Sequence, residues 1–67
     1  MKIPFKWFGV GEWYRQGYFS CLDMFTYDWL DSDYIYGSIL RTEMEHSRKI
    51  RAYGAGMRKA WEERNEV

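Results

Sequence analysis

Apolar residues recur at helical spacing along two stretches of the chain. In the first, over residues 12–30, they stand three or four positions apart, as on one face of an amphipathic helix. They are Tyr14, Tyr18, Cys21, Phe25 and Trp29, with Leu22 beside them. The same stretch contains Gly17 and is rich in aromatic residues, which favour strands. The spacing therefore predicts a first helix over residues 12–30, and a β-hairpin that turns at Gln16-Gly17 is the alternative.

The second stretch predicts a long helix over residues 33–64. Its apolar stripe, which also takes in one histidine, comprises Ile35, Ile39, His46, Ile50, Tyr53, Met57 and Trp61. The sequence Asp31-Ser32-Asp33 stands at its start, where short polar side chains accept hydrogen bonds from the N–H groups of a first helical turn. Gly54 and Gly56 each cost roughly 1 kcal/mol in a helix interior. A break near residues 54–56 is therefore the alternative to one continuous helix.

Residues 1–11 are expected to form an extended arm. They hold the chain's one proline, Pro4, together with Gly9 and Gly11, and they carry three large apolar side chains, Phe5, Trp7 and Phe8. The 67 residues are thus predicted to form a single small domain of the mainly α class, a helical hairpin with an aromatic-rich N-terminal arm. The alternative is an α+β fold, in which an N-terminal β-hairpin packs on one long helix.

Aromatic residues are unusually frequent, with 4 Trp, 6 Tyr and 4 Phe. A chain this short has one small core that cannot easily enclose so many rings, so some should remain on the surface. Such a core supplies only about 3–5 kcal/mol of stability, and the single cysteine, Cys21, excludes an internal disulfide. We therefore expect the protein to associate with itself or with a larger protein.

Charge is balanced overall but divided along the chain, which carries 10 basic and 10 acidic residues. Residues 12–33 are mainly acidic and residues 41–59 are mainly basic, so the two segments can pair within one chain or between chains. The basic segment also offers an alternative function, nucleic-acid binding, through Arg48, Lys49, Arg51, Arg58 and Lys59. A net charge of zero argues against that alternative, because nucleic-acid-binding domains usually carry a basic excess.

Candidate catalytic chemistry is sparse, and we expect that the protein is not an enzyme and uses no cofactor. It has one cysteine and one histidine, and Gly9-Val10-Gly11 lacks the strand-then-helix setting of a phosphate-binding loop. Glu43 and His46 have the Glu-x-x-His spacing of helical di-iron sites, but the further carboxylates that such a site needs have no strong candidates. We therefore predict no metal site and interpret Glu43 and His46 as a hydrogen-bonded polar pair in an apolar seam.

Location is predicted from two observations. No apolar run approaches the ~20 residues that a membrane span needs, and the residues before Lys6 lack the apolar region of a signal peptide. We expect an intracellular, cytoplasmic protein with no membrane partner.

A row of small residues beside a row of large ones is the predicted contact surface of the second helix. The small row is Ala52, Gly56 and Ala60, and the large row, one position later, is Tyr53, Met57 and Trp61. Such a profile lets another helix pack closely, because ridges at i±4 spacing fit into grooves. That helix can be the chain's own first helix or one from a second protein, and we favour the second protein.

The predicted function is therefore that of a small protein-binding module, an inhibitor, adaptor or accessory subunit, a class that includes those that phages make against host enzymes. Its predicted partner-binding residues are Trp7, Trp13, Ala52, Tyr53, Gly56, Met57, Ala60 and Trp61. The predicted partner is a larger protein, a second copy of the chain, or both.

Overall fold

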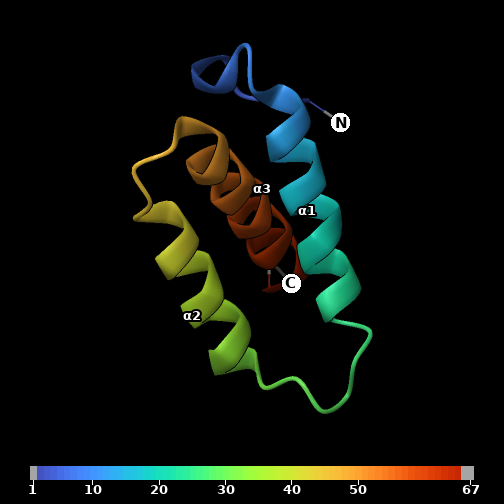
Figure 1. Ribbon diagram of the computed structural model, residues 1–67. Helices are drawn as coiled ribbons and strands as arrows, with labels where there is room; N and C mark the ends of the chain where they lie inside the picture. Colours follow the sequence, from blue (N-terminus) through green and yellow to red (C-terminus); the bar gives the residue numbers. More distant parts are fainter. Residues whose placement is uncertain (1, 66–67) are drawn as a thin grey trace.

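The computed structural model describes residues 2–65, and over this range the chain is mainly helical (Figure 1). A short 3-10 helix, η1 (Phe5–Trp7), precedes three α-helices, α1 (Gly11–Met24), α2 (Ser32–Glu43) and α3 (Arg48–Asn65). The described residues contain no strand. The prediction of a mainly α fold is confirmed, and the β-hairpin alternative is not supported.

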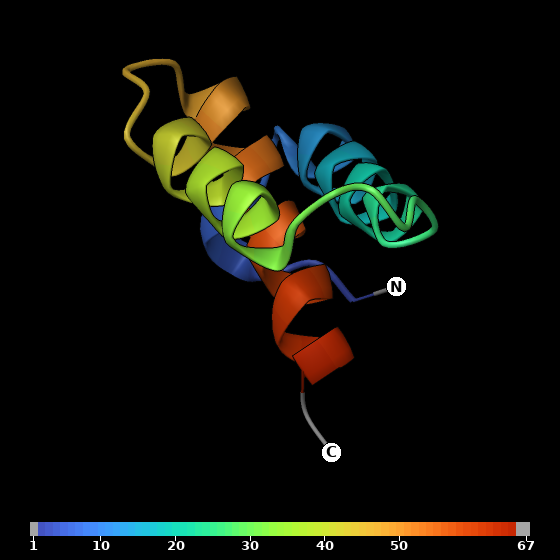
Figure 2. The same cartoon turned by 90° about the horizontal axis from the view of Figure 1, so that it is seen from below.

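Helix α3 is the centre of the arrangement, because it packs against both α1 and α2. Figure 2 shows it crossing one side of both helices, with its C-terminal end projecting beyond them. The chain runs along α1, returns along α2 and then turns into α3, so the arm and the α2–α3 loop lie at one end of the molecule (Figure 1). The α1–α2 loop lies at the opposite end.

The first helix ends at Met24, six residues before the predicted boundary. Beyond it the chain makes tight turns, in which Thr26 N bonds to Asp23 O and Tyr27 N bonds to Met24 O. The hydroxyl of Thr26 also donates to the carbonyl of Asp23 at 2.7 Å, a side-chain bond that competes with continued helix. As a result Trp29, predicted on the apolar stripe, lies in a loop and is 78% exposed.

The predicted long helix is two helices, separated at residues 44–47 rather than at 54–56. The described residues therefore form a three-helix arrangement in place of a two-helix hairpin. The predicted polar cap is confirmed, since the Asp31 carboxylate accepts a hydrogen bond from Asp33 N at 3.0 Å, and α2 begins at Ser32, one residue before the predicted start. The start of α3 at Arg48 was not predicted. There the carbonyl oxygen of Ser47 accepts a hydrogen bond from Arg51 N at 2.9 Å.

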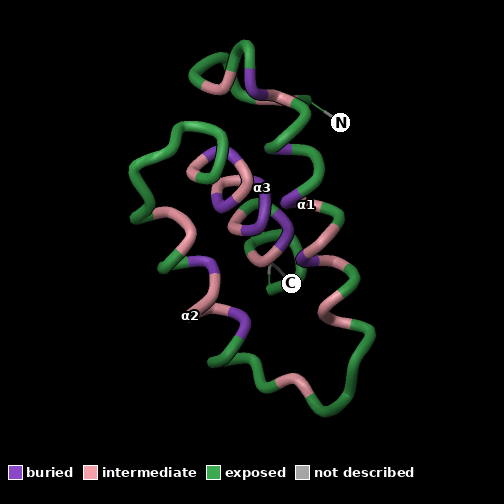
Figure 3. Tube along the Cα trace, viewed as in Figure 1, coloured by how far each residue is buried: buried purple, intermediate pink, exposed green. Residues whose placement is uncertain are grey.

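Buried residues gather along α3 and on the faces of α1 and α2 that meet it (Figure 3). The larger cluster contains Cys21, Ile35, Ile39, Met57 and Ala60. A second cluster, made by Val10, Tyr14 and Ala52, lies beneath the N-terminal arm. The second cluster explains how a short arm can be held in place, since Ile3 and Trp7 pack against it.

Candidate binding surface

The N-terminal arm, residues 2–10, is fixed on the helices by one arginine. Arg48, at the start of α3, donates from Nη2 to the carbonyl oxygens of Lys6 and Phe8, each at 2.8 Å. Gly9 has a φ of +88°, a left-handed conformation that turns the chain from the arm into α1. The arm is therefore not fully extended as predicted, because its middle forms η1.

Two phenylalanine rings project from this fixed backbone into solvent. Phe5 is 89% exposed and Phe8 is 77% exposed, and their ring centroids lie 6.2 Å apart in a stacked arrangement. Trp7, between them in sequence, turns inward and is half-buried. Burial of Trp7 anchors the arm, which leaves Phe5 and Phe8 available for contact with another molecule.

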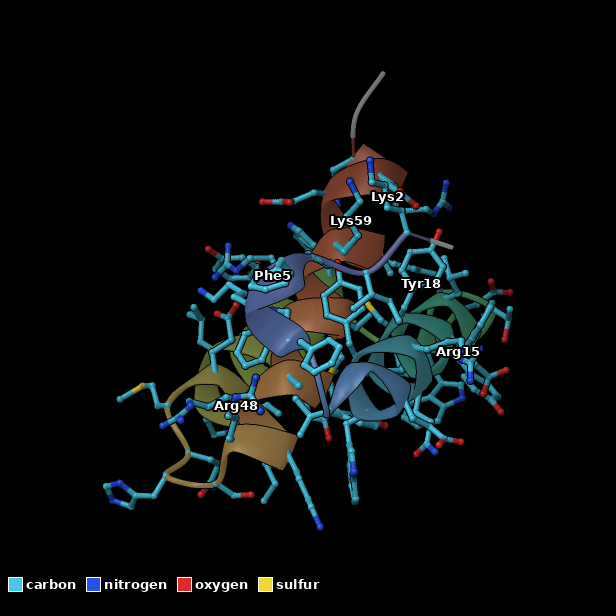
Figure 4. The ribbon with its side chains drawn as sticks, turned by 90° about the horizontal axis from the view of Figure 1, so that it is seen from above. Lys2, Phe5, Arg15, Tyr18, Arg48 and Lys59 are labelled. Carbon is cyan, nitrogen blue, oxygen red and sulfur yellow. The ribbon has the colours of Figure 1, made fainter. Side chains whose placement is uncertain are left out.

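A hollow of about 950 Å³, here called the arm hollow, opens beside these rings. The arm forms one wall, Tyr14 and Tyr18 of α1 line it, and Lys59 and Glu63 of α3 complete it. Figure 4 shows Lys2 and Lys59 near the same end of the hollow, with Tyr18 on the α1 side and Phe5 on the other. The arm hollow is thus largely apolar, with charged groups gathered toward one end.

The polar groups of the arm hollow are joined to one another. The Tyr18 hydroxyl donates to Glu63 Oε1, and Lys59 Nζ lies 3.8 Å from Glu63 Oε2. The hydrogen bond to Glu63 raises the pKa of Tyr18, while burial, followed by the charges of Glu63 and Glu62, raises the pKa of Tyr14. Both phenols therefore keep their protons at neutral pH.

A second hollow, of about 690 Å³ and here called the basic hollow, adjoins the arm hollow and shares Pro4, Trp7, Tyr14 and Lys59 with its lining. It contains four of the five residues predicted for nucleic-acid binding, namely Arg48, Arg51, Arg58 and Lys59. Lys6 adds a fifth cation, whereas Glu43 and Glu62 add two carboxylates. The fifth predicted residue, Lys49, is not part of its lining; its ammonium lies 5.8 Å from the ring centroid of Trp13.

The small-residue row predicted to receive a partner is filled by the chain itself. Ala52 and Ala60 have no exposed surface, and a side chain built on Gly56 would collide with the backbone carbonyl of Tyr14 in α1. The groove is real, but its occupant is α1. In the described structure Ala52, Gly56 and Ala60 are therefore buried against other residues of the same chain, and they are not open to a partner as predicted.

The large-residue row also serves the core. Met57 is buried, and Tyr53 and Trp61 are half-buried against the larger cluster. The Trp61 ring lies between Phe25 and Tyr36, at centroid distances of 5.9 and 5.3 Å. Of the predicted partner-binding residues, only Trp13 is exposed, at 39%, while Trp7 is half-buried against the second cluster. Phe5 and Phe8 were not in the predicted partner-binding set, although the sequence had marked them as apolar side chains of the arm.

The predicted Glu43–His46 pair does not form. Glu43 ends α2 and accepts two hydrogen bonds from Arg58, at 2.6 and 2.8 Å, whereas His46 is exposed in the α2–α3 loop. The break in the helix separates the two side chains, and the charged pair with Arg58 replaces the predicted one. Within residues 2–65, no three His, Cys, Asp or Glu side chains come together in a way that could hold a metal ion.

None of the helices in the described range is long and apolar enough to cross a membrane. The chain matches no known protein family, and comparisons with curated proteins and with solved structures returned no similar protein.

Proposed function

We propose that this protein is a binding module that holds an apolar segment of a larger protein in the arm hollow. The segment would contact the rings of Phe5 and Phe8, here called the arm rings, which belong to the lining of this hollow. The observation that carries the proposal is the exposure of Phe5 and Phe8, at 89% and 77%, on a backbone fixed by Arg48. Aromatic side chains dominate the energetics of protein interfaces. Rings that face solvent contribute little to the stability of the fold, so we infer that they serve to contact another molecule.

Presentation on a fixed backbone supports this function. Ordering a loop on association costs free energy, and a segment that is already held avoids that cost. The two hydrogen bonds from Arg48 and the burial of Trp7 hold the arm before any partner arrives. The module can then act as an inhibitor, adaptor or accessory subunit simply by occupying a surface of its partner.

The shape of the arm hollow supports an apolar ligand segment with a polar end. Sites for peptides and small molecules are mostly apolar, with a few polar groups that fix orientation. Apolar arm residues and two tyrosines form the body of this hollow, and Lys59 and Glu63 lie together at one side of it. We infer that the segment presents aliphatic or aromatic side chains to the rings and a polar group to Lys59 and Glu63.

Nucleic-acid binding through the basic hollow is the second candidate function. It is favoured by the gathering of Arg48, Arg51, Arg58 and Lys59 around one hollow. Two carboxylates line the same hollow, and Arg58 already makes two hydrogen bonds to Glu43. These acids weaken attraction for phosphates, so we favour protein binding.

The test is an affinity capture from lysate of the source organism with three forms of the protein. The double variant Phe5→Ala/Phe8→Ala removes the arm rings. Phe19→Ala is the matched control, because Phe19 is also an exposed phenylalanine, at 56%, but lies outside the lining of the arm hollow. A protein retained by the wild type and by Phe19→Ala, but lost by the double variant, supports the proposal. Equal retention by all three forms contradicts it.

A further inference from the structure

A second group of exposed rings lies at the end of the molecule opposite the arm. Tyr27 and Trp29 belong to the α1–α2 loop and Tyr34 to the first turns of α2, and they are 46%, 78% and 55% exposed. The rings of Tyr27 and Trp29 lie 5.9 Å apart. We call residues 23–34 the acidic end, because this stretch also carries four aspartates and no lysine or arginine.

The charge of the acidic end is not neutralised within the described chain. Asp23, Asp28, Asp31 and Asp33 are exposed, and none of them forms an ion pair with another described residue. Asp31 uses its carboxylate to cap α2. One cation is nearby, Arg64, whose guanidinium lies 5.5 Å from the ring centroid of Phe25. A surface that combines exposed rings with an excess of carboxylates is complementary to a cationic surface with an apolar part.

The basic hollow has that complementary character. Five cationic side chains line it against two carboxylates, and Trp7 and Pro4 supply apolar surface. Residues of the arm and of α3 line it, and the arm lies at the end of the molecule opposite the α1–α2 loop (Figure 1). None of the residues of the acidic end belongs to its lining, so both surfaces are open to another molecule.

We propose that copies of this chain associate head to tail, with the acidic end of one copy seated in the basic hollow of the next. Trp29 is the apolar anchor of this contact, and Asp28 faces the cations of the hollow, among them Lys6 and Arg51. The contact uses two different surfaces, so it is heterologous and adds further copies instead of closing at a symmetric pair. This inference goes beyond the proposed function, since neither Phe5 nor Phe8 lines the basic hollow.

The test uses two variants that each block one surface. Asp28→Lys/Trp29→Ala blocks the acidic end, and Lys6→Glu/Arg51→Glu blocks the basic hollow. In sedimentation velocity at low salt, the wild type should form a concentration-dependent series of species that shortens as salt rises. Each variant alone should remain monomeric, with an apparent dissociation constant raised by about tenfold or more.

Mixing the variants provides the decisive step. Each blocked variant keeps the surface that the other lacks, so an equimolar mixture should form a one-to-one dimer and nothing larger. Phe5→Ala/Phe8→Ala should still form the wild-type series, which separates this test from that of the proposed function. Circular dichroism checks that each variant is folded, and Lys6→Glu alone replaces the double variant if Arg51→Glu disturbs α3.

Three results would overturn the proposal. They are a wild type that stays monomeric at low salt and high concentration, a variant that still self-associates alone, and a mixture that forms no dimer. A monomeric wild type that binds a duplex oligonucleotide, with binding lost in Lys6→Glu/Arg51→Glu, would instead assign the basic hollow to nucleic acid.

Discussion

Gly17 of α1 lies directly against the backbone of Tyr53 in α3, so closely that a side chain built on Gly17 would collide with the Tyr53 carbonyl. The contact is reciprocal, because Gly56 of α3 meets the backbone of Tyr14 in the same way. The two helices therefore touch backbone to backbone. This close packing compensates for the low intrinsic helix propensity of glycine.

Gly17→Ala should destabilise the protein even though alanine is the better helix former. Overpacking of this kind typically costs about 1–3 kcal/mol. The matched control is Gly37→Ala in α2, where nothing lies within 4 Å of the new methyl group, and a gain of about 0.5–1 kcal/mol is expected. Urea unfolding of both variants measures the difference. If the two substitutions shift the free energy of unfolding in the same direction, the close contact of α1 and α3 is wrong.

The glycines show where sequence reasoning reached its limit. The row of small residues at i, i+4 spacing correctly predicted a groove on the C-terminal part of the predicted long helix, which is α3 in the structure. It could not show which helix fills the groove, since that depends on where the chain turns back. Gly54 and Gly56 also indicated a break in the helix, yet both are buried residues of α3. Neighbouring backbone lies so close at both positions that adding a side chain would force its neighbours to move.

Arg48→Ala should release the arm while leaving the helices folded. The substitution removes the hydrogen bonds to the carbonyl oxygens of Lys6 and Phe8, with an expected loss of about 1 kcal/mol. Hydrogen exchange should accelerate at amides of the arm and remain slow in the core of α3. Arg48→Lys keeps the charge but loses the planar donor group, so it should protect the arm less than wild type. Unchanged exchange in the arm of Arg48→Ala would show that Arg48 does not hold it.

Glu43→Gln should cost more stability than a change at an exposed ion pair. Glu43 accepts two hydrogen bonds from Arg58. Because charge-assisted bonds are stronger than neutral ones, we expect the free energy of unfolding to fall by about 1–2 kcal/mol. The control is Lys59→Gln, which removes the 3.8 Å pair with Glu63 and should cost about 0.5 kcal/mol or less. Thermal unfolding compares the two, and a larger effect at Lys59 would contradict the assigned role of Glu43.

The break between α2 and α3 escaped prediction because residues 42–48 contain neither glycine nor proline. Ile39 and Ile50 continue one apolar stripe across the break, as they would in a continuous helix. Ser47 was the available signal, since serine before a helical run is a typical N-cap residue. The end of α1 at Met24 also escaped prediction, because Phe25 and Trp29 continue the apolar spacing beyond it.

Alkaline pH should destabilise the protein through Cys21. Burial raises the pKa of this thiol from 9.0 to about 11. The folded state therefore retains the proton at pH values where the unfolded chain has lost it, so stability falls as pH rises from about 9 toward 11. Urea unfolding at neutral pH and between these two values should show the decline, and Cys21→Ala should show a weaker one.

The folded thiol should also resist a maleimide reagent at neutral pH. Rapid labelling of the native protein would contradict the burial of Cys21.

Site-specific photo-crosslinking at Phe8 tests the central claim, that the arm rings form the partner-binding surface, most directly. A photoreactive phenylalanine analogue is placed at Phe8 in one preparation and at Phe19 in a second, and both are irradiated in lysate of the source organism. Mass spectrometry then identifies the adducts. The account predicts one larger protein joined through position 8 and absent from the position 19 sample. The same adducts from both positions, or none from position 8, would contradict it.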